Sequence, residues 1–160
     1  MSADLTALAT QVLALARARS VKIATAESCT GGLIIGALTE IAGSSDVVDR
    51  GFITYSNEAK IEMLGIDPDT LEHHGAVSEQ IAQQMADGAL ARSRAGLTVS
   101  VTGIAGPGGS AFKPEGRVCF GLAQTGQATR VKTVEFGALG RSNVRLATVR
   151  TALEWLREAL

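Results

Sequence analysis

Short apolar runs alternate with helical segments along this sequence, and that alternation limits the fold more than any other feature. Runs with the length and composition of strands occupy residues 22–26, 51–55, 97–101, 117–123 and 129–136. Helical segments separate the first three runs, whereas a hairpin-length turn that contains Gly126 joins the last two. This order indicates an α/β protein: a three-layer α/β/α sandwich with a mixed, mostly parallel five-stranded sheet in which one strand is antiparallel.

Two longer helices are predicted at the ends of the chain, where apolar residues recur every three or four positions. The apolar positions of the first helix, over residues 3–18, are Leu5, Leu8, Val12 and Leu15. Those of the last helix, from about Arg141 onward, are Leu146, Val149, Leu153, Leu156 and Leu160. Between them, helices are predicted over 33–41, over 58–64 after an Asn57 cap, from Asp67-Pro68, and after Ser78.

The composition excludes several classes of protein. Hydrophobic residues make up 46% of the chain, within the roughly 45–50% of soluble globular proteins, so a core can form without disulfides or metals. Lys and Arg number 15 and Asp and Glu 16, which gives a net charge of −1, and aromatic residues make up only 4%. We therefore expect no nucleic-acid partner, no base-stacking platform and no membrane partner.

The sequence also shows no targeting or anchoring segment. No apolar run approaches the roughly 18 residues of a membrane span, and the first residues lack the cationic start and cleavage site of a signal peptide. Cys29 and Cys119 form no metal-binding or redox spacing, which favours a reduced compartment. We expect one cytoplasmic domain over residues 1–160, with no metal and no cofactor, and a homo-oligomer is possible.

Three loops leave the carboxyl ends of predicted strands, at residues 27–32, 55–60 and 102–110. Ligands of open α/β sheets bind beyond these strand ends, so the three loops should converge on one site. They contain most of the candidate reactive groups of the chain.

Ser28 is the first candidate nucleophile, because it follows a strand and precedes two glycines and a helix. Its hydroxyl would lie beside the free N–H groups of Thr30, Gly31 and Gly32, which could hold a developing oxyanion. Alternatively, Ser28 or Thr30 only caps the helix. Cys29 is a second candidate nucleophile, although a lone cysteine here could simply pack against the sheet.

Lys60 is the candidate base, since a serine needs an adjacent base to act as a nucleophile. With Asn57 as cap, Lys60 takes the third helical position, where the helix dipole and partial burial would lower its pKa. The histidines at 73 and 74 occupy a polar turn and are poorly placed for this role. The alternative is a solvated surface lysine.

Two neighbours of this pair are further candidates. Tyr55, at a strand end, could donate a hydrogen bond into the same cleft, or it could be a half-buried strand aromatic. Glu27, directly before Ser28, could orient Lys60 or bind a ribose hydroxyl.

We expect a phosphate to be held by Arg145, with Arg141 as a second arginine, and by backbone N–H groups of the loop that begins at Thr102. The loop, 102–109, includes Gly103 and Gly106 but has neither a Walker A nor a G-x-G-x-x-G pattern, so it could also be a plain turn. Arg141 and Arg145 lie one turn apart at the start of the last helix, where cations oppose the helix dipole unless an anion is bound. Two solvated arginines are the alternative.

Four segments resemble the CinA C-terminal domain family, also known as nicotinamide mononucleotide (NMN) deamidase or PncC. They are AESCTGG at 26–32, GFITYSNEAK at 51–60, HGAVS at 74–78 and TGIAGP at 102–107. The resemblance extends from about residue 5 to the end. It implies the three-layer fold and a bacterial cytosolic enzyme that hydrolyses the carboxamide of NMN to nicotinate mononucleotide and ammonia.

The resemblance and the residues agree on a Ser–Lys amidase. Ser28 would attack the carboxamide carbon with Lys60 as base and Tyr55 beside them. Larger CinA proteins carry an additional N-terminal domain and a pyrophosphatase activity, which the resemblance does not extend to this chain. The alternative function is a non-catalytic nucleotide-binding or regulatory domain, and a weaker one is a Cys29 thiol hydrolase.

Overall fold

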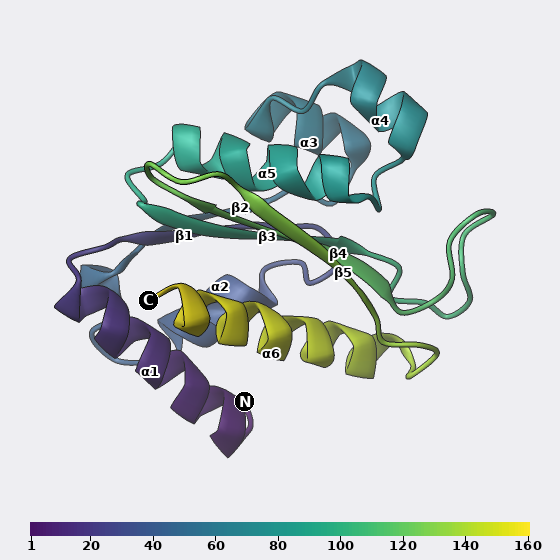
Figure 1. Ribbon diagram of the computed structural model, residues 1–160. Coiled ribbons are helices and arrows are strands. Elements are labelled where there is room, and N and C mark those ends of the chain that lie inside the picture. The colour runs from purple at the N-terminus through teal and green to yellow at the C-terminus, as the bar shows by residue number, and fades with distance from the viewer.

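The computed structural model describes residues 1–160, in which five strands form one sheet between two layers of helices (Figure 1). In chain order the elements are α1 (Ala3–Ala18), β1 (Ile23–Glu27), α2 (Leu33–Thr39), the 3₁₀ turn η1 (Ser44–Asp46), β2 (Val48–Ile53), α3 (Asn57–Leu64), α4 (Pro68–His74), α5 (Glu79–Ala91), β3 (Leu97–Gly103), β4 (Arg117–Gln124), β5 (Arg130–Glu135) and α6 (Arg141–Ala159). Helices α1, α2 and α6 lie below the sheet in Figure 1, and α3, α4 and α5 lie above it. The predicted three-layer sandwich is confirmed.

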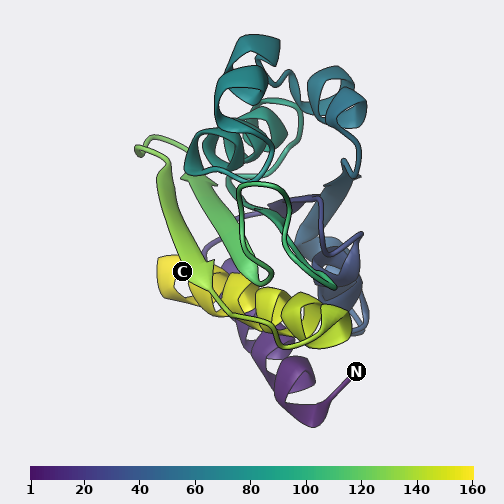
Figure 2. The ribbon, with the colours of Figure 1, turned by 90° about the vertical axis from the view of Figure 1, so that its right-hand side faces the viewer.

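The strand order is β2-β1-β3-β4-β5. Strand β1 runs parallel to both of its neighbours, while β4 runs antiparallel to β3 and to β5. Four strands therefore point the same way, as the sequence predicts. Because β1, β2, β3 and β5 all end at one edge, the loops after them and the start of α6 meet there, and Figure 2 looks onto this edge.

Apolar side chains fill the space on both faces of the sheet. Strands β1 and β3 are buried along almost their whole length, as expected for central strands covered by helices on both faces. The larger cluster lies under α1, α2 and α6, where Trp155 packs edge-to-face on Phe120 with ring centroids 6.5 Å apart. The smaller one lies under α5 and includes Ile81 and Met85. The two cores hold the sheet edges, and so the site loops, in fixed relative positions.

Several predicted boundaries and local assignments differ from the structure. Strand β2 ends at Ile53, so Tyr55 lies in the loop beyond the strand. Ser56 caps α3 in place of Asn57, because its hydroxyl accepts a hydrogen bond from the N–H of Ala59 at 3.0 Å; Ser and Asn are comparably good caps, and the sequence does not distinguish them. The histidine pair belongs to the last turn of α4, which continues further than the Asp-Pro start suggests.

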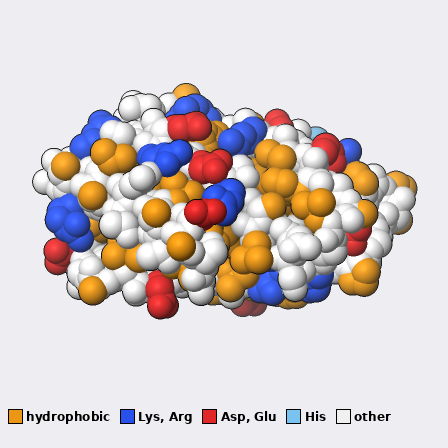
Figure 3. Space-filling model, turned by 90° about the horizontal axis from the view of Figure 1, so that it is seen from below, with side chains coloured by type: hydrophobic (Ala, Val, Ile, Leu, Met, Phe, Trp, Pro, Cys, Tyr) orange, Lys and Arg blue, Asp and Glu red, His pale blue; other side chains and the backbone are white.

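The helical faces are also rotated slightly from the predicted stripes. Leu15 and Leu146 are 38% and 49% exposed, whereas Leu13 of α1 and Val144 of α6 are buried. The layer that contains α1, α2 and α6 therefore presents scattered hydrophobic side chains among charged ones (Figure 3). None of the helices combines the length and the apolar character needed to cross a bilayer.

Candidate active site

The loops that leave β1, β2 and β3 enclose a cavity of about 430 Å³ at one sheet edge. The first loop contributes Ser28 and Cys29, and the second contributes Tyr55 with Asn57 and Lys60 of α3. Residues 102–110 form another wall, and Arg141 of α6 stands at the margin. The three loops selected from the sequence thus converge on one space.

Ser28 and Lys60 meet inside this cavity. Lys60 Nζ lies 3.0 Å from Ser28 Oγ, 2.9 Å from the carbonyl oxygen of Thr54 and 3.3 Å from that of Tyr55. The Lys60 side chain is 1% exposed and has no ion pair, and burial lowers the pKa of its amine below the usual 10.5. The three oxygens accept the three N–H donors of the ammonium. Once deprotonated, the amine has two donors, for the two carbonyl oxygens, and one lone pair for the Ser28 hydroxyl.

The structure excludes a solvated surface lysine at position 60. Because Ser56 is the cap, Lys60 takes the fourth helical position and not the third. From there its side chain runs inward beneath the β2–α3 loop and donates hydrogen bonds to the carbonyl oxygens of Thr54 and Tyr55. The predicted proximity to Ser28 is present, and its distance lies in the range of a direct proton transfer.

Glu27 has neither of the roles expected from the sequence. Its carboxylate is fully buried in the turn and accepts four hydrogen bonds, from the Thr25 and Thr30 hydroxyls at 2.9 and 2.6 Å and from the N–H groups of Ile34 and Ile35 at 2.9 and 3.0 Å. No oxygen is left to orient Lys60 or to bind a ribose. The carboxylate instead accepts from the first free N–H groups of α2, since a helix N-terminus attracts a carboxylate.

The turn after Ser28 differs in detail from the predicted oxyanion site. The Gly31 N–H donates to the Ser28 carbonyl oxygen at 3.1 Å, so it is occupied. The N–H groups of Thr30 and Gly32 have no acceptor, but neither residue is among those that line the cavity around Ser28 and Lys60. The predicted helix capping by Ser28 or Thr30 is wrong, because Gly32 is the N-cap residue and makes no side-chain bond, while the Thr30 hydroxyl donates to Glu27. Gly31 and Gly32 have φ of +58° and +106°, which glycine adopts without strain.

Cys29 is a poor nucleophile in this setting. Its side chain is 4% exposed and belongs to the apolar core below the sheet. Burial raises the pKa of its thiol to about 12. Because the thiolate is the reactive form, the structure argues against a thiol hydrolase and favours the packing alternative.

Arg141 links two loops at the mouth of the cavity. Its guanidinium donates to the carbonyl oxygen of Gly106 at 2.7 Å and to the Tyr55 hydroxyl at 3.0 Å. Tyr55 is 62% exposed, so the half-buried strand aromatic is wrong. Arg141 has no acidic partner, which leaves its charge available to an anion.

Two members of the predicted phosphate loop serve the fold. The Thr102 hydroxyl donates to the carbonyl oxygen of Ala76 at 2.9 Å and is not free for a ligand. Gly103 continues β3, and a Cβ there would lie 2.6 Å from Val118 Cγ2 of β4. Both residues still border the cavity, whose lining continues from them through Gly106 to Ser110.

Arg145 lies apart from the cavity lining. It is half-buried, and its guanidinium donates to the carbonyl oxygens of Cys29 at 3.1 Å and Thr30 at 3.2 Å. The two arginines predicted to form one clamp therefore have different partners: Arg141 reaches the cavity mouth and Arg145 holds the turn after Ser28.

Sequence reasoning missed several lining residues. The sequence predicts Asn57 as a helix cap, whereas its exposed side chain lines the cavity. The serine before it is the signal that the cap can lie one residue earlier. Ala76 and Ile104 contribute apolar surface; both lie in segments that the family resemblance covers, at 74–78 and 102–107, but their apolar side chains do not mark them as site residues.

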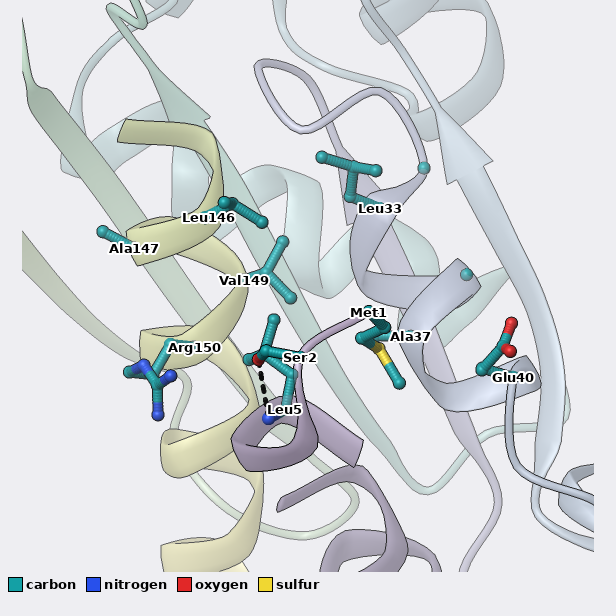
Figure 4. A pocket seen from close by; sticks show the side chains of 12 residues that line it. Met1, Ser2, Leu5, Leu33, Ala37, Glu40, Leu146, Ala147, Val149 and Arg150 are labelled. Atoms are coloured by element: carbon teal, nitrogen blue, oxygen red, sulfur yellow. Dashed lines mark hydrogen bonds between the residues drawn. The ribbon is translucent and has the colours of Figure 1, made fainter. Parts of the chain in front are cut away.

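A larger cavity of about 840 Å³ lies between α1, α2 and α6 (Figure 4). Its walls are mainly apolar, with Leu33 and Ala37 on one side and Leu146 and Val149 on the other. It brings no nucleophile together with a base, so its size does not make it the reactive site.

A family model, curated relatives and solved structures all match this protein over nearly the whole chain. The family model described as CinA C-terminal domain matches residues 5–160. The nicotinamide-nucleotide amidohydrolase PncC of Enterobacter agglomerans is 50% identical over 92% of this chain and 90% of that protein. The crystal structure of the competence/damage inducible protein CihA from Agrobacterium tumefaciens superposes with a TM-score of 0.94, at 54% identity, over 98% of this chain and 95% of that one.

Other relatives are longer. A CinA-like protein of Mycolicibacterium vanbaalenii is 48% identical over 94% of this chain but only 35% of its own length. The chain spans about a third of the length of several such curated relatives.

Proposed function

Because the chain belongs to the CinA C-terminal domain family, we propose that residues 1–160 act as one amidohydrolase domain that converts NMN to nicotinate mononucleotide and ammonia. The observation that carries the proposal is the buried Lys60 amine 3.0 Å from the Ser28 hydroxyl. Relatives named nicotinamide-nucleotide amidohydrolase PncC, which this chain matches over nearly their full length, support the substrate.

In the first half of the proposed reaction, Ser28 is acylated. Neutral Lys60 takes the proton of the Ser28 hydroxyl while Oγ attacks the carboxamide carbon, and the carbonyl π electrons move to the oxygen. The proposed donors to the resulting oxyanion are backbone N–H groups of the turn that follows Ser28. As the C–N bond breaks, the Lys60 ammonium gives the proton to the leaving nitrogen, which departs as ammonia.

In the second half, water releases the acid. Lys60 is neutral again and accepts a proton from a water molecule that attacks the ester carbon. The tetrahedral intermediate collapses, the bond to Ser28 Oγ breaks, and the proton returns from Lys60 to Oγ. The product is nicotinate mononucleotide, and the two carbonyl oxygens of Thr54 and Tyr55 hold Lys60 in place throughout.

The phosphate of NMN would lie at the opposite end of the cavity from the reacting amide. Arg141 is suited to hold it, because its guanidinium stands at the mouth without an acidic partner. The Tyr55 hydroxyl and the backbone of the loop around Gly106 lie beside this guanidinium and complete the proposed phosphate end. The cytoplasm is the proposed compartment, in keeping with two free cysteines.

The test is ammonia release from the purified protein with NMN, compared with nicotinamide riboside and nicotinamide. We expect turnover of NMN, its loss in Ser28→Ala with the fold retained, and full turnover in Cys29→Ala, the matched control at the neighbouring position. Full activity in Ser28→Ala would exclude the covalent mechanism. NMN binding by the wild type without ammonia release would instead favour a non-catalytic nucleotide-binding domain.

A further inference from the structure

We propose that Asn57 is a specificity-determining residue: its side-chain carbonyl oxygen accepts an N–H of the substrate carboxamide and so selects amides at the reacting end of the cavity. This inference rests on the proposed function and deepens it. It starts from the residues that line the cavity together with Ser28 and Lys60. Asn57 contributes the only side-chain carbonyl of that lining, which contains no Asp, Glu or Gln.

Asn57 lies beside the amine of Lys60. It is the first residue of α3, one turn before Lys60, so the two side chains leave the same face of the helix. The Lys60 side chain runs back toward the N-terminus of α3, because its amine donates to the carbonyl oxygens of Thr54 and Tyr55, both of which precede the helix. The amine therefore lies level with the first turn, where Asn57 stands, and both residues border the same cavity as Ser28.

The Asn57 side chain is available to a ligand. It is exposed and makes no hydrogen bond within the protein, since the serine before it caps α3. Other polar groups of the lining have partners: the Thr102 hydroxyl donates to a backbone oxygen, and the Tyr55 hydroxyl accepts from Arg141. At the reacting end of the cavity, Asn57 therefore supplies an unused acceptor.

A primary carboxamide needs such an acceptor. It carries two N–H donors, and an N–H that loses water without gaining a partner weakens binding. During the proposed attack, the Ser28 hydroxyl gives its proton to Lys60, and the Lys60 ammonium then donates to the leaving nitrogen. Asn57 Oδ1, by accepting one N–H, keeps this nitrogen beside Lys60 and leaves its lone pair, which forms as the carbon becomes tetrahedral, to receive the proton. An ester has no N–H for this oxygen, so the contact favours amides.

The test is steady-state kinetics of Asn57→Ala and Asn57→Asp on NMN and on the methyl ester of nicotinate mononucleotide, with Glu58→Gln as matched control. Glu58 is the next residue of α3, is exposed and does not border the cavity. We expect kcat/KM of Asn57→Ala to fall about 10- to 100-fold on the amide, as for a buried donor left unpaired, and less than about threefold on the ester. Glu58→Gln should leave both values unchanged.

Asn57→Asp tests the placement beside Lys60 separately. The lining contains no other carboxylate, so a carboxylate at position 57 stabilises the Lys60 ammonium and should move the rise of kcat/KM with pH to higher pH. Because a carboxylate also accepts an N–H, this variant should keep, above that rise, the preference for the amide that Asn57→Ala loses.

Three results would overturn the inference. An unmoved pH profile in Asn57→Asp would refute the placement. Unchanged kinetics of Asn57→Ala on the amide, or an equal loss on amide and ester, would refute the selection of amides. A loss in Asn57→Ala that accompanies reduced helical circular dichroism would assign the residue to the fold instead.

Further substrates keep the inference separate from the choice of NMN. If the wild type releases no ammonia from NMN but does so from nicotinamide riboside or nicotinamide, the proposed substrate fails. The inference is then decided on that amide and its methyl ester, by the same comparison of Asn57→Ala with the wild type. A wild type that hydrolyses the esters but none of the carboxamides overturns both the proposed function and the inference.

Discussion

Replacing Glu27 by Gln should destabilise the protein, although the two side chains have nearly the same shape. The carboxylate accepts from two hydroxyls and from the N–H groups of Ile34 and Ile35. Glutamine offers one carbonyl oxygen and one NH₂ group. A threonine hydroxyl can rotate to accept from the NH₂ group, but a backbone N–H cannot, so one buried amide is left facing a donor.

The size of the effect follows from these contacts. An unsatisfied buried donor costs about 1–3 kcal/mol, and the remaining bonds lose their charge-assisted strength. The lost interaction with the α2 dipole adds up to about 1 kcal/mol, while the easier desolvation of a neutral amide offsets part of the total. We expect a net loss of about 3 kcal/mol in the free energy of unfolding, which corresponds to a fall in Tm of roughly 6–12 °C for a chain of this size.

Urea and thermal unfolding followed by circular dichroism measure this loss. The matched control is Glu40→Gln, because Glu40 stands exposed at the other end of α2 and its carboxylate has no hydrogen bond; that variant should stay within about 0.5 kcal/mol of the wild type. A Glu27→Gln variant as stable as the control would refute the assignment of Glu27 as the internal cap of the turn.

Two further predictions concern Lys60 and Arg141. Lys60→Met should lower kcat at least about 10²-fold, as for loss of a general base. The folded-state pKa of Lys60 is depressed, so the unfolded chain binds more protons between that pKa and 10.5, and the free energy of unfolding of the wild type rises with pH across this window. That rise should be missing in Lys60→Met. In the wild type, kcat/KM should increase as Lys60 deprotonates below pH 10.5, and a flat profile would contradict its role as base. Arg141→Ala should raise KM for NMN by roughly ten- to 150-fold, from the loss of about 1.5–3 kcal/mol, with little change for nicotinamide riboside; comparable damage to both substrates would show that Arg141 does not recognise the phosphate.

The layers and the site loops could be predicted because they follow from local patterns. Apolar runs bounded by glycine and polar residues predict the strands, and the rule that ligands lie beyond strand ends selects loops 27–32, 55–60 and 102–110. The same rule brings Ser28 and Lys60 to one edge before any contact is known. Their local signals were distinct: a hydroxyl before two glycines, and a cation in a first helical turn.

The partners of the charged residues could not be predicted, because they depend on packing between distant segments. Arg145 contacts carbonyl oxygens 115 and 116 positions earlier in the chain, and no spacing encodes such a contact. Glu27 has several plausible partners in sequence, and only the position of α2 over the end of β1 shows which are nearest. The prediction of Asn57 as the cap of α3 was wrong for a different reason, because two good capping residues, Ser56 and Asn57, are adjacent.

The single antiparallel strand, β4, affects which insertions and deletions leave the candidate active site intact. The chain leaves this edge at the end of β3, descends through β4, and ascends again through β5 before α6 begins with Arg141. A hairpin of two strands starts and finishes at the same end of the sheet. Lengthening it, shortening it or adding a second hairpin leaves the start of α6 at that end, whereas a single extra strand would place α6 at the opposite end. We therefore expect an insertion or deletion in this half of the chain to be tolerated only if the number of strands between β3 and α6 stays even. An even number keeps Arg141 and Arg145 beside Ser28, and an odd number places them at the opposite end of the sheet.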